Sequence, residues 1–330
     1  MPLITLIFSR DRAMQLDAVL RSFFLRCLDG ELEQVYVLYR TSTEQHARQY
    51  AALQETYPTV NFVTQGEFRR DVLRIANPYG GGSLAERRYT ALNELISNLI
   101  SLERFPLRYW QSALYRLRTK ILGHLFPTPP EDSHILFLVD DNLFVRDFSL
   151  RESAQLLRGH PRALGFSLRL GENTAYCYAM DHAQALPEFA SLGAGVLKFD
   201  WTTSELDFAY PLEISSSVYR LKDIFPVIVR QPFSNPNELE YQLAVSAAQY
   251  SQRMPFLLCP EKSLTFCNPL NLVQNFAPNR ASDAMEYSSE HLADLFDQGY
   301  RVQIEAFRGF VPQSCHQEVA LEFYKPEGQI

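Results

Sequence analysis

The chain has 330 residues, of which 46% are hydrophobic and 21% charged, and it carries a formal net charge of -7. This balance is typical of a soluble globular protein with a large core. It argues against a nucleic-acid binder, which needs an extended basic face for phosphate contacts. The five cysteines are widely spaced and form no Cys-x-x-Cys pair, so a reducing cytoplasm is the expected compartment. No run approaches the ~18 apolar residues of a membrane-spanning helix.

The first sixty residues predict alternating strands and helices. An apolar strand covers 3–8, apolar residues recur at helical spacing from Leu16 to Cys27, and a second strand covers 35–39. Strand, helix and strand form a βαβ unit, which implies a parallel sheet with right-handed crossovers. A further helix and strand over 44–63 extend the pattern. The opening strand is too short for the core of a signal peptide.

A glycine triplet at 80–82 is followed by Ser83 and Glu86, which form a capping box at the start of a helix. The orphan N–H groups of such a terminus favour anions, and Arg87 or Arg88 would add charge-assisted bonds to a phosphate. A plain turn before a solvated helix is the alternative. This is not a P-loop, because no Gly-Lys-Ser/Thr follows the glycines.

The segment 105–126 interleaves aromatic and basic residues on one predicted helix. Such a pattern suggests an interfacial segment, or a grip on an acidic acceptor. A surface helix that packs its aromatic side chains inward is the alternative, because half-buried amphipathic helices are common. On the first interpretation the protein touches the inner face of a membrane peripherally.

The apolar run 135–139 predicts a buried strand that delivers Asp140, Asp141 and Asn142 where it meets solvent. Open α/β sheets hold their ligands at this edge. Two adjacent acids repel unless a cation or a set of donors offsets the repulsion, and hard oxygen ligands suit Mg²⁺ or Mn²⁺ holding a diphosphate. The alternative is a solvated turn after a core strand, because Asp-Asp-Asn is also good turn chemistry.

Beyond this segment, Ser149 and Glu152 predict a second capping box, and Gly159 ends that helix. Residues 163–171 predict the next strand. No internal repeat or low-complexity segment interrupts the chain, which fits one integrated domain.

Residues 137–147 read FLVDDNLFVRD. This segment resembles the metal-binding segment of family 2-type glycosyltransferases with the GT-A fold, in the nucleotide-diphospho-sugar transferase superfamily. The resemblance implies an α/β, Rossmann-like fold with a mostly parallel sheet flanked by helices, in a single large domain. Residues 1–160 would form the nucleotide-sugar-binding half, and 161–330 the acceptor-binding half with a C-terminal extension.

The resemblance also implies roles for single residues near the metal. Asp140 would contact the nucleoside, whereas Asp141 would hold the metal that bridges the diphosphate of a sugar nucleotide. Many enzymes of this fold take a further metal ligand from a C-terminal histidine, which makes His316 a candidate. A solitary surface histidine is the alternative.

The loop after the first strand cradles the nucleoside in such enzymes, so Ser9, Arg10 and Asp11 are candidate nucleotide-binding residues. The family often has an acid after the second strand that pairs with uracil. This chain has Arg40 there instead. Arg40 is therefore a further candidate, and the preferred base stays open.

An aromatic-rich run over 199–219 marks the second half of the chain. Aromatic faces stack on sugar rings while acids take the hydroxyl groups, so Trp201 and Glu213 are candidates for binding the acceptor. Core packing is the alternative for any one aromatic side chain in this run.

Asn235 and Pro236 predict the start of a helix with Glu238 in its first turn, where the helix dipole favours an ionised carboxylate. An inverting glycosyltransferase needs one carboxylate to take the proton of the acceptor hydroxyl. In the family this acid opens a helix, typically within a Glu-Asp pair, which Asn237-Glu238 resembles with both members changed. Glu238 is the expected base and Glu240 the reserve. Alternatively, Glu238 only completes a capping box with Asn235.

The implied activity is metal-dependent transfer of a sugar from a nucleoside-diphosphate sugar, with UDP as the expected nucleotide, to a hydroxyl of a carbohydrate or lipid-linked acceptor. Inversion follows from a single displacement. Synthesis of surface polysaccharide or glycolipid would use such an enzyme. Two alternatives stay open. A sugar-nucleotide nucleotidyltransferase shares the topology, but residues 8–11 lack the glycines it needs. A GT-A-like module could also bind a nucleotide or glycan without turnover.

Overall fold

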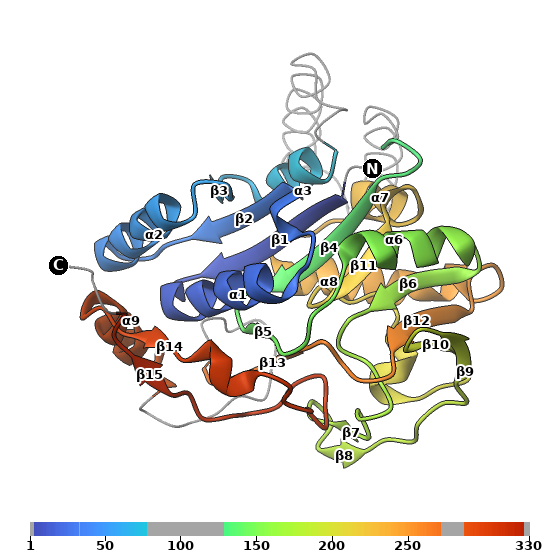
Figure 1. The fold of residues 1–330 in the computed structure, drawn as a ribbon. Helices are drawn as coiled ribbons and strands as arrows, with labels where there is room; N and C mark the ends of the chain where they lie inside the picture. The colour runs from blue at the N-terminus through green and yellow to red at the C-terminus, as the bar shows by residue number, and fades with distance from the viewer. Residues whose placement is uncertain (1–2, 33, 78–128, 272–286, 327–330) are drawn as a thin grey trace, which may run out of the picture.

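The computed structural model describes residues 3–32, 34–77, 129–271 and 287–326. Its central feature is a nine-stranded sheet in the order β3-β2-β1-β4-β11-β6-β12-β10-β9 (Figure 1). The strands of this sheet are β1 (Leu3–Arg10), β2 (Gln34–Arg40), β3 (Asn61–Thr64), β4 (His134–Val139), β6 (Ala163–Ser167), β9 (Ala190–Gly193), β10 (Val196–Asp200), β11 (Ser217–Arg220) and β12 (Phe256–Pro260).

The first four strands of the sheet run parallel, as their βαβ connections require. β11 lies antiparallel between β4 and β6, and β10 lies antiparallel to β12, whereas β6 and β12 are parallel. The prediction of an α/β fold with a mostly parallel sheet is therefore confirmed. The carboxyl ends of β1, β2, β3 and β4 consequently meet at one edge of the sheet.

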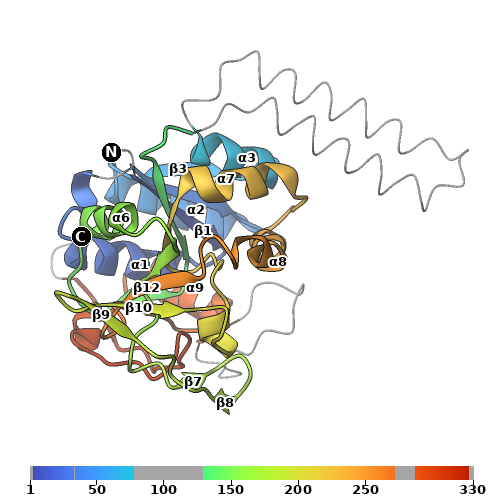
Figure 2. The same ribbon diagram turned by 90° about the vertical axis from the view of Figure 1, so that its right-hand side faces the viewer.

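Seven α-helices lie in the described part of the chain, and the sheet separates them into two groups (Figure 2). The first group shares one core with the sheet and comprises α1 (Ala13–Arg26), α2 (Glu44–Thr56), α6 (Leu150–Gly159) and α9 (Ser289–Asp297). The second group packs on the opposite face and comprises α3 (Phe68–Ala76), α7 (Leu221–Arg230) and α8 (Pro236–Ser246).

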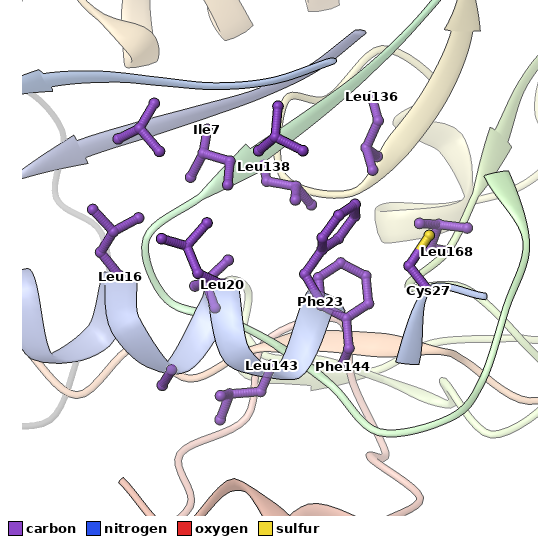
Figure 3. Packing of buried hydrophobic residues seen from close by; sticks show 14 of the residues in the cluster. Ile7, Leu16, Leu20, Phe23, Cys27, Leu136, Leu138, Leu143, Phe144 and Leu168 are labelled. Atoms are coloured by element: carbon purple, nitrogen blue, oxygen red, sulfur yellow. The ribbon is translucent and has the colours of Figure 1, made fainter. Parts of the chain in front are cut away.

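The core beneath α1 shows why these segments fold as they do. Leu16, Leu20 and Phe23 recur at helical spacing and point from α1 toward Ile7 and Leu138 of the sheet (Figure 3). All five side chains are fully buried. Each such burial stabilises the fold by about 1.5–3 kcal/mol. This core fixes α1, and with it the loop between β1 and α1, against the sheet.

Three two-stranded pairs accompany the large sheet in the described part of the chain. They join β5 (Asn142–Phe144) to β13 (Thr265–Cys267), β7 (Tyr176–Cys177) to β8 (His182–Ala183), and β14 (Arg301–Val302) to β15 (Phe323–Tyr324). The first pair ties the acidic segment to the C-terminal part of the chain, because the Asn268 N–H also donates to the Asp141 carbonyl at 2.9 Å. A bridge between Cys267 and His316 continues this connection.

Two predicted caps are confirmed. The Ser149 side chain accepts from the Glu152 N–H at 3.1 Å, and the Asn235 side chain accepts from the Glu238 N–H at 3.0 Å. The predicted strand 163–171 is shorter than expected, because sheet pairing ends at Ser167 and the chain then turns.

Arg87, Arg88 and the segment 105–126 lie outside the described residues. Across the described ranges, no helix combines the length and the apolar character needed to cross a bilayer. Membrane contact through 105–126 stays a prediction.

Candidate functional site

A cavity of about 890 Å³ opens at the carboxyl ends of β1, β2 and β4. Its β1–β4 end is lined by Ser9, Arg10, Arg12, Arg40, Asp140 and Asp141. Its α8 end is lined by Arg169, Asp207, Tyr210 and Glu240, and His316 also lines the cavity. A volume of this size accommodates a ligand as large as a sugar nucleotide.

Asp140 organises the end of β1 and the loop that follows it. One carboxylate oxygen accepts from the Ser9 hydroxyl at 2.9 Å and from the Arg10 backbone N–H at 3.0 Å. The other accepts from an Arg12 Nη1 at 2.9 Å. Both oxygens are thus engaged by the protein, and the buried Asp140 fixes the shape of this end of the cavity.

Arg12 is a site residue that the sequence analysis left out. Its Nη1 lies 2.9 Å from Asp140 and 3.8 Å from Asp141, and its Nη2 donates to the Asn271 carbonyl. Only 10% of its side chain is exposed. Arg12 therefore supplies the cation that two adjacent buried acids need. The signal in the sequence that could have identified Arg12 was its position directly after the predicted nucleotide-binding residues Ser9, Arg10 and Asp11.

Asp141 differs from Asp140 in having a free oxygen. Its Oδ1 is buried and has no hydrogen-bond partner in the described part of the molecule. Burial raises the pKa of Asp141; Arg12 opposes this rise and Asp140 adds to it. Asp141 lines the cavity, and a buried carboxylate oxygen without a partner is an acceptor that a donor or a cation would satisfy.

Of the two remaining nucleotide-binding candidates, Arg40 and Asp11, only Arg40 lines the cavity. Arg40 is the last residue of β2, lines the cavity and is exposed. Asp11 is not among the lining residues, because its carboxylate accepts from the Ser42 N–H at 2.7 Å. Its φ of 54° places it in the left-handed region that aspartate tolerates. Asp11 thus shapes the β1–α1 loop and joins it to the end of β2.

The fit of a divalent metal rests on Asp141 and His316, which line the same cavity. Burial, with help from Arg169, lowers the pKa of His316 to about 3, so its ring is neutral and can donate a lone pair. Among the described residues no three metal-ligating side chains gather. Magnesium sites often use one or two carboxylates and take further oxygens from substrate phosphates, so the residues present fit such an ion.

Helix α8 presents Glu240, rather than Glu238, to the cavity. Glu238 accepts from the Ser234 N–H at 2.7 Å and the Ser234 hydroxyl at 2.9 Å, while its own N–H donates to Asn235. Glu238 is thus engaged in capping the helix. Two residues along a helix correspond to a rotation of about 200°, which is why the two acids face different surroundings.

Glu240 has the electrostatic character of a base that works near neutral pH. Burial raises its pKa to about 7; Arg169 opposes the rise and Glu213 adds to it. Tyr210, which also lines the cavity, feels the charge of Glu240 in turn. A carboxylate with a pKa near the operating pH is well matched to general base catalysis.

Arg169 is the second site residue that the sequence analysis left out. It follows β6, is 4% exposed and donates from Nη1 to the Ser215 hydroxyl at 2.8 Å. Ser215 donates in turn to Glu213 at 2.7 Å. The signal in the sequence was a lone arginine within the apolar stretch after Ala163.

Two acceptor candidates are not brought to the cavity, which corrects the expectation for both. Trp201 is 7% exposed within the core and donates its indole N–H to the Met254 carbonyl at 2.8 Å. Glu213 is 2% exposed behind the cavity wall. The Trp201 indole is thus satisfied inside the protein by a carbonyl distant in sequence. One Glu213 oxygen instead accepts from the nearby Ser215 hydroxyl and from the Ser216 N–H at 3.0 Å.

Comparison with known proteins adds an independent observation. No family model matches the chain. The curated bifunctional glycosyltransferase pgtA of Dictyostelium discoideum is 25% identical over 276 residues. The chain resembles a known glycosyltransferase. The match covers 76% of this chain, which spans only 29% of the length of that relative.

Solved structures of lower similarity were also found. The structure of S. aureus TarS is 11% identical with a TM-score of 0.41, covering 81% of this chain and 36% of that one. A complex of S. aureus TarS 1-349 with UDP-GlcNAc gives a TM-score of 0.36 at 11% identity, covering 74% and 54%. Mouse xyloside xylosyltransferase 1 gives 0.32 at 9% identity, covering 78% and 77%.

Proposed function

We propose that this chain is a glycosyltransferase that moves a sugar from a nucleoside-diphosphate sugar to an acceptor hydroxyl. The observation that carries the proposal is the pairing of two chemistries in one cavity. Asp141 and Arg12 lie at the β1–β4 end, and Glu240, with a pKa of about 7, lies at the α8 end. The resemblance to pgtA supports the same activity.

The β1–β4 end would take the nucleoside diphosphate. Arg10 and Arg40 line it with exposed guanidinium groups, and Arg12 adds a buried one. Guanidinium groups bind phosphate oxygens through charge-assisted hydrogen bonds. Their positive charge also favours the diphosphate as a leaving group, since negative charge accumulates there as the bond to the sugar breaks.

Asp141, with His316 as a further ligand, would hold Mg²⁺ or Mn²⁺. The orphaned Asp141 oxygen supports this assignment. When bound, such an ion neutralises charge on the leaving diphosphate. Arg12 offsets part of the repulsion between Asp140 and Asp141.

Glu240 would be the general base. Its carboxylate takes the proton of the acceptor hydroxyl as the acceptor oxygen bonds to the anomeric carbon and the bond from that carbon to the diphosphate breaks. A single displacement of this kind inverts the configuration at the anomeric carbon. Glu240 thus replaces Glu238, which is committed to its cap, as the proposed base.

The experiment that tests the proposal compares Glu240→Gln with Glu238→Gln. Purified protein is incubated with labelled UDP-sugars and simple glycoside acceptors, and both transfer and donor hydrolysis are measured. Glu240→Gln is expected to lower kcat by about 10²–10⁴-fold while UDP binding, measured by calorimetry, is retained. Glu238→Gln makes the same change on the same helix and is expected to keep activity within a few-fold.

Three outcomes would count against the proposal as stated. Full activity in Glu240→Gln would show that Glu240 is not the base. Loss of activity only in Glu238→Gln would show that Glu238 is the base. A wild-type chain that binds UDP but neither hydrolyses nor transfers any donor would be a nucleotide-binding module without turnover.

A further inference from the structure

The hydroxyl of Tyr50 lies behind the cavity wall and has no part in the chemistry described so far. Tyr50 belongs to α2, is fully buried and is not among the residues that line the cavity. Its hydroxyl nevertheless contacts two residues that do line it, because it hydrogen-bonds the Ser9 hydroxyl and accepts from the Arg12 backbone N–H at 3.3 Å. One buried hydroxyl thus joins the end of β1 to the start of α1.

These contacts belong to a closed ring of hydrogen bonds that begins and ends at Arg12. An ionised carboxylate can only accept, so the single hydrogen of the Ser9 hydroxyl goes to Asp140, at 2.9 Å. Ser9 must then accept from Tyr50, whose oxygen accepts in turn from the Arg12 N–H. Asp140 closes the ring, because its other oxygen accepts from the Arg12 guanidinium at 2.9 Å. Every hydrogen of the ring therefore has one direction.

The ring fixes the backbone of Arg12 and its guanidinium relative to each other. The residue before it, Asp11, has a φ of 54°, a conformation that the surrounding contacts must hold in place. Without the Tyr50 oxygen, the Arg12 N–H would regain a partner only if the loop turned toward water. The guanidinium would move with the loop, away from the position that the ring gives it.

Tyr50 can act as a support because its own ring is held from two directions. It stacks on Tyr39 of β2, with ring centroids 4.7 Å apart and planes at 14°. The preceding residue of α2, Gln49, fastens the helix to α9 by donating to the Ala293 carbonyl at 2.8 Å and to Asp297 at 2.9 Å. Side chains that are locked by such packing hold the groups of a binding site in their productive geometry.

We infer that Tyr50 is a positioning residue that holds the Arg12 guanidinium where it reaches the diphosphate of the donor. This inference rests on the proposed function, in which Arg12 binds that diphosphate. Tyr50 acts through Arg12 and Ser9 and does not itself touch the ligand, because it is buried outside the cavity. Removing its hydroxyl should therefore weaken the contacts to phosphate and leave the contacts to the nucleoside as they are.

The test is Tyr50→Phe, which removes the hydroxyl and keeps the aromatic ring. Calorimetry of the full chain measures the affinities for UDP and GDP, and each nucleoside, uridine or guanosine, is titrated in competition with its diphosphate. For a nucleotide that wild type binds, the affinity for the diphosphate should fall about tenfold, and that for the nucleoside should stay within about twofold, because the unpartnered N–H affects only the Arg12 loop. A tyrosine that served only the fold would not change the ratio of the two affinities.

Tyr57→Phe is the matched control. Tyr57 follows the end of α2, donates its hydroxyl to the buried Asp17 carboxylate at 2.7 Å and does not line the cavity. Its loss removes a comparable hydrogen bond at a distance from the site. Tyr57→Phe should therefore lower Tm about as much as Tyr50→Phe does, while it leaves all four affinities unchanged.

Ser9→Ala breaks the same ring at the next position and leaves Tyr50 in place. Alone, it should lower the affinity for the diphosphate more than that for the nucleoside. Added to Tyr50→Phe, it should weaken diphosphate binding by less than it does in wild type, because the ring is already open and the two losses are coupled. Full additivity of the two substitutions would contradict the ring.

The outcomes separate this inference from the proposed function. If wild type binds neither UDP nor GDP, the proposed function fails and the inference fails with it. If a diphosphate binds but Tyr50→Phe and Tyr57→Phe have the same affinity for it, only the inference is overturned. An equal loss of nucleoside and diphosphate affinity in Tyr50→Phe would also overturn it, because the damage would then extend beyond Arg12.

Discussion

The two ends of the cavity draw their side chains from different kinds of chain segment. The β1–β4 end takes its residues from the carboxyl ends of neighbouring parallel strands and the loops after them, as Ser9 lies near the end of β1 and Asp140 follows β4. The α8 end combines Arg169 and Glu240, which are separated by a long stretch of chain. Sheet register brings most of the first set together, whereas tertiary packing positions the second.

The electrostatics of the two ends differ in the same way. At the β1–β4 end, Arg12 contacts Asp140 directly at 2.9 Å. At the α8 end, Arg169 acts on Glu240 across the cavity wall while its own hydrogen bond goes to Ser215. We expect the direct Arg12–Asp140 pair to contribute mainly to the free energy of unfolding. The more distant Arg169 is expected to act mainly on the pKa of Glu240. The predictions below test this difference.

The largest effect is expected from Arg12→Met. Removing one partner of a buried ion pair leaves uncompensated charge, here on two acids, and should lower the free energy of unfolding by about 3–5 kcal/mol. Urea unfolding followed by circular dichroism measures this change. Arg10→Met is the matched control, because the Arg10 side chain is 46% exposed and its loss should cost no more than about 0.5 kcal/mol. Equal stability of the two variants would contradict the role given to Arg12.

A smaller effect is expected from Asp141→Ala. Wild-type affinity for UDP should fall about tenfold or more when Mn²⁺ is replaced by a chelator. The size is set by analogy with metal affinity, to which even residues that only support a metal ligand contribute about 10–100-fold. Asp141→Ala should bind UDP weakly and equally in both conditions, as calorimetry would show. Asp147→Asn removes a carboxylate from the same segment, but one whose side chain is 59% exposed, and should behave as wild type. A metal effect that survives in Asp141→Ala would exclude it as the ligand.

Local patterns predicted the strand before the two acids and the starts of two helices well. The strand 135–139 and the two acids after it follow from an apolar run and its end, and the confirmed caps at Ser149 and Asn235 depend on residues only three positions apart. Arg12 was missed because its role depends on Asp140, a residue 128 positions away. Periodicity gives the element that carries a side chain, but not the partner it meets.

The α8 end could not be predicted at the same level. Glu238 and Glu240 lie on one helix, and the sequence does not show which of them faces the cavity. The choice depends on how α8 packs against α7 and the sheet. Trp201 illustrates the same limit, because a tryptophan in a sugar site and one in a core have the same local pattern. Its bond to the Met254 carbonyl arises only in the folded chain.

The smallest effect, and the sharpest test of the α8 end, concerns pH. Glu240 accepts a proton only when ionised, and its pKa is raised to about 7, so the transfer rate should rise with pH through about 7. Well below this value the rate should fall about tenfold for each pH unit, because the ionised fraction falls by that factor. The measurement is kcat/KM for transfer between pH 5 and 9.

Substituting the two neighbours should shift this midpoint in opposite directions. Arg169→Met removes a cation that favours the ionised form and should move the midpoint to higher pH, whereas Glu213→Gln removes an anion and should move it to lower pH. Arg169→Lys keeps the charge and should restore most of the wild-type profile. If both residues served only to hold the fold, each variant would lose activity at every pH without moving the midpoint. Opposite shifts can arise only if both charges act on the group that takes the proton.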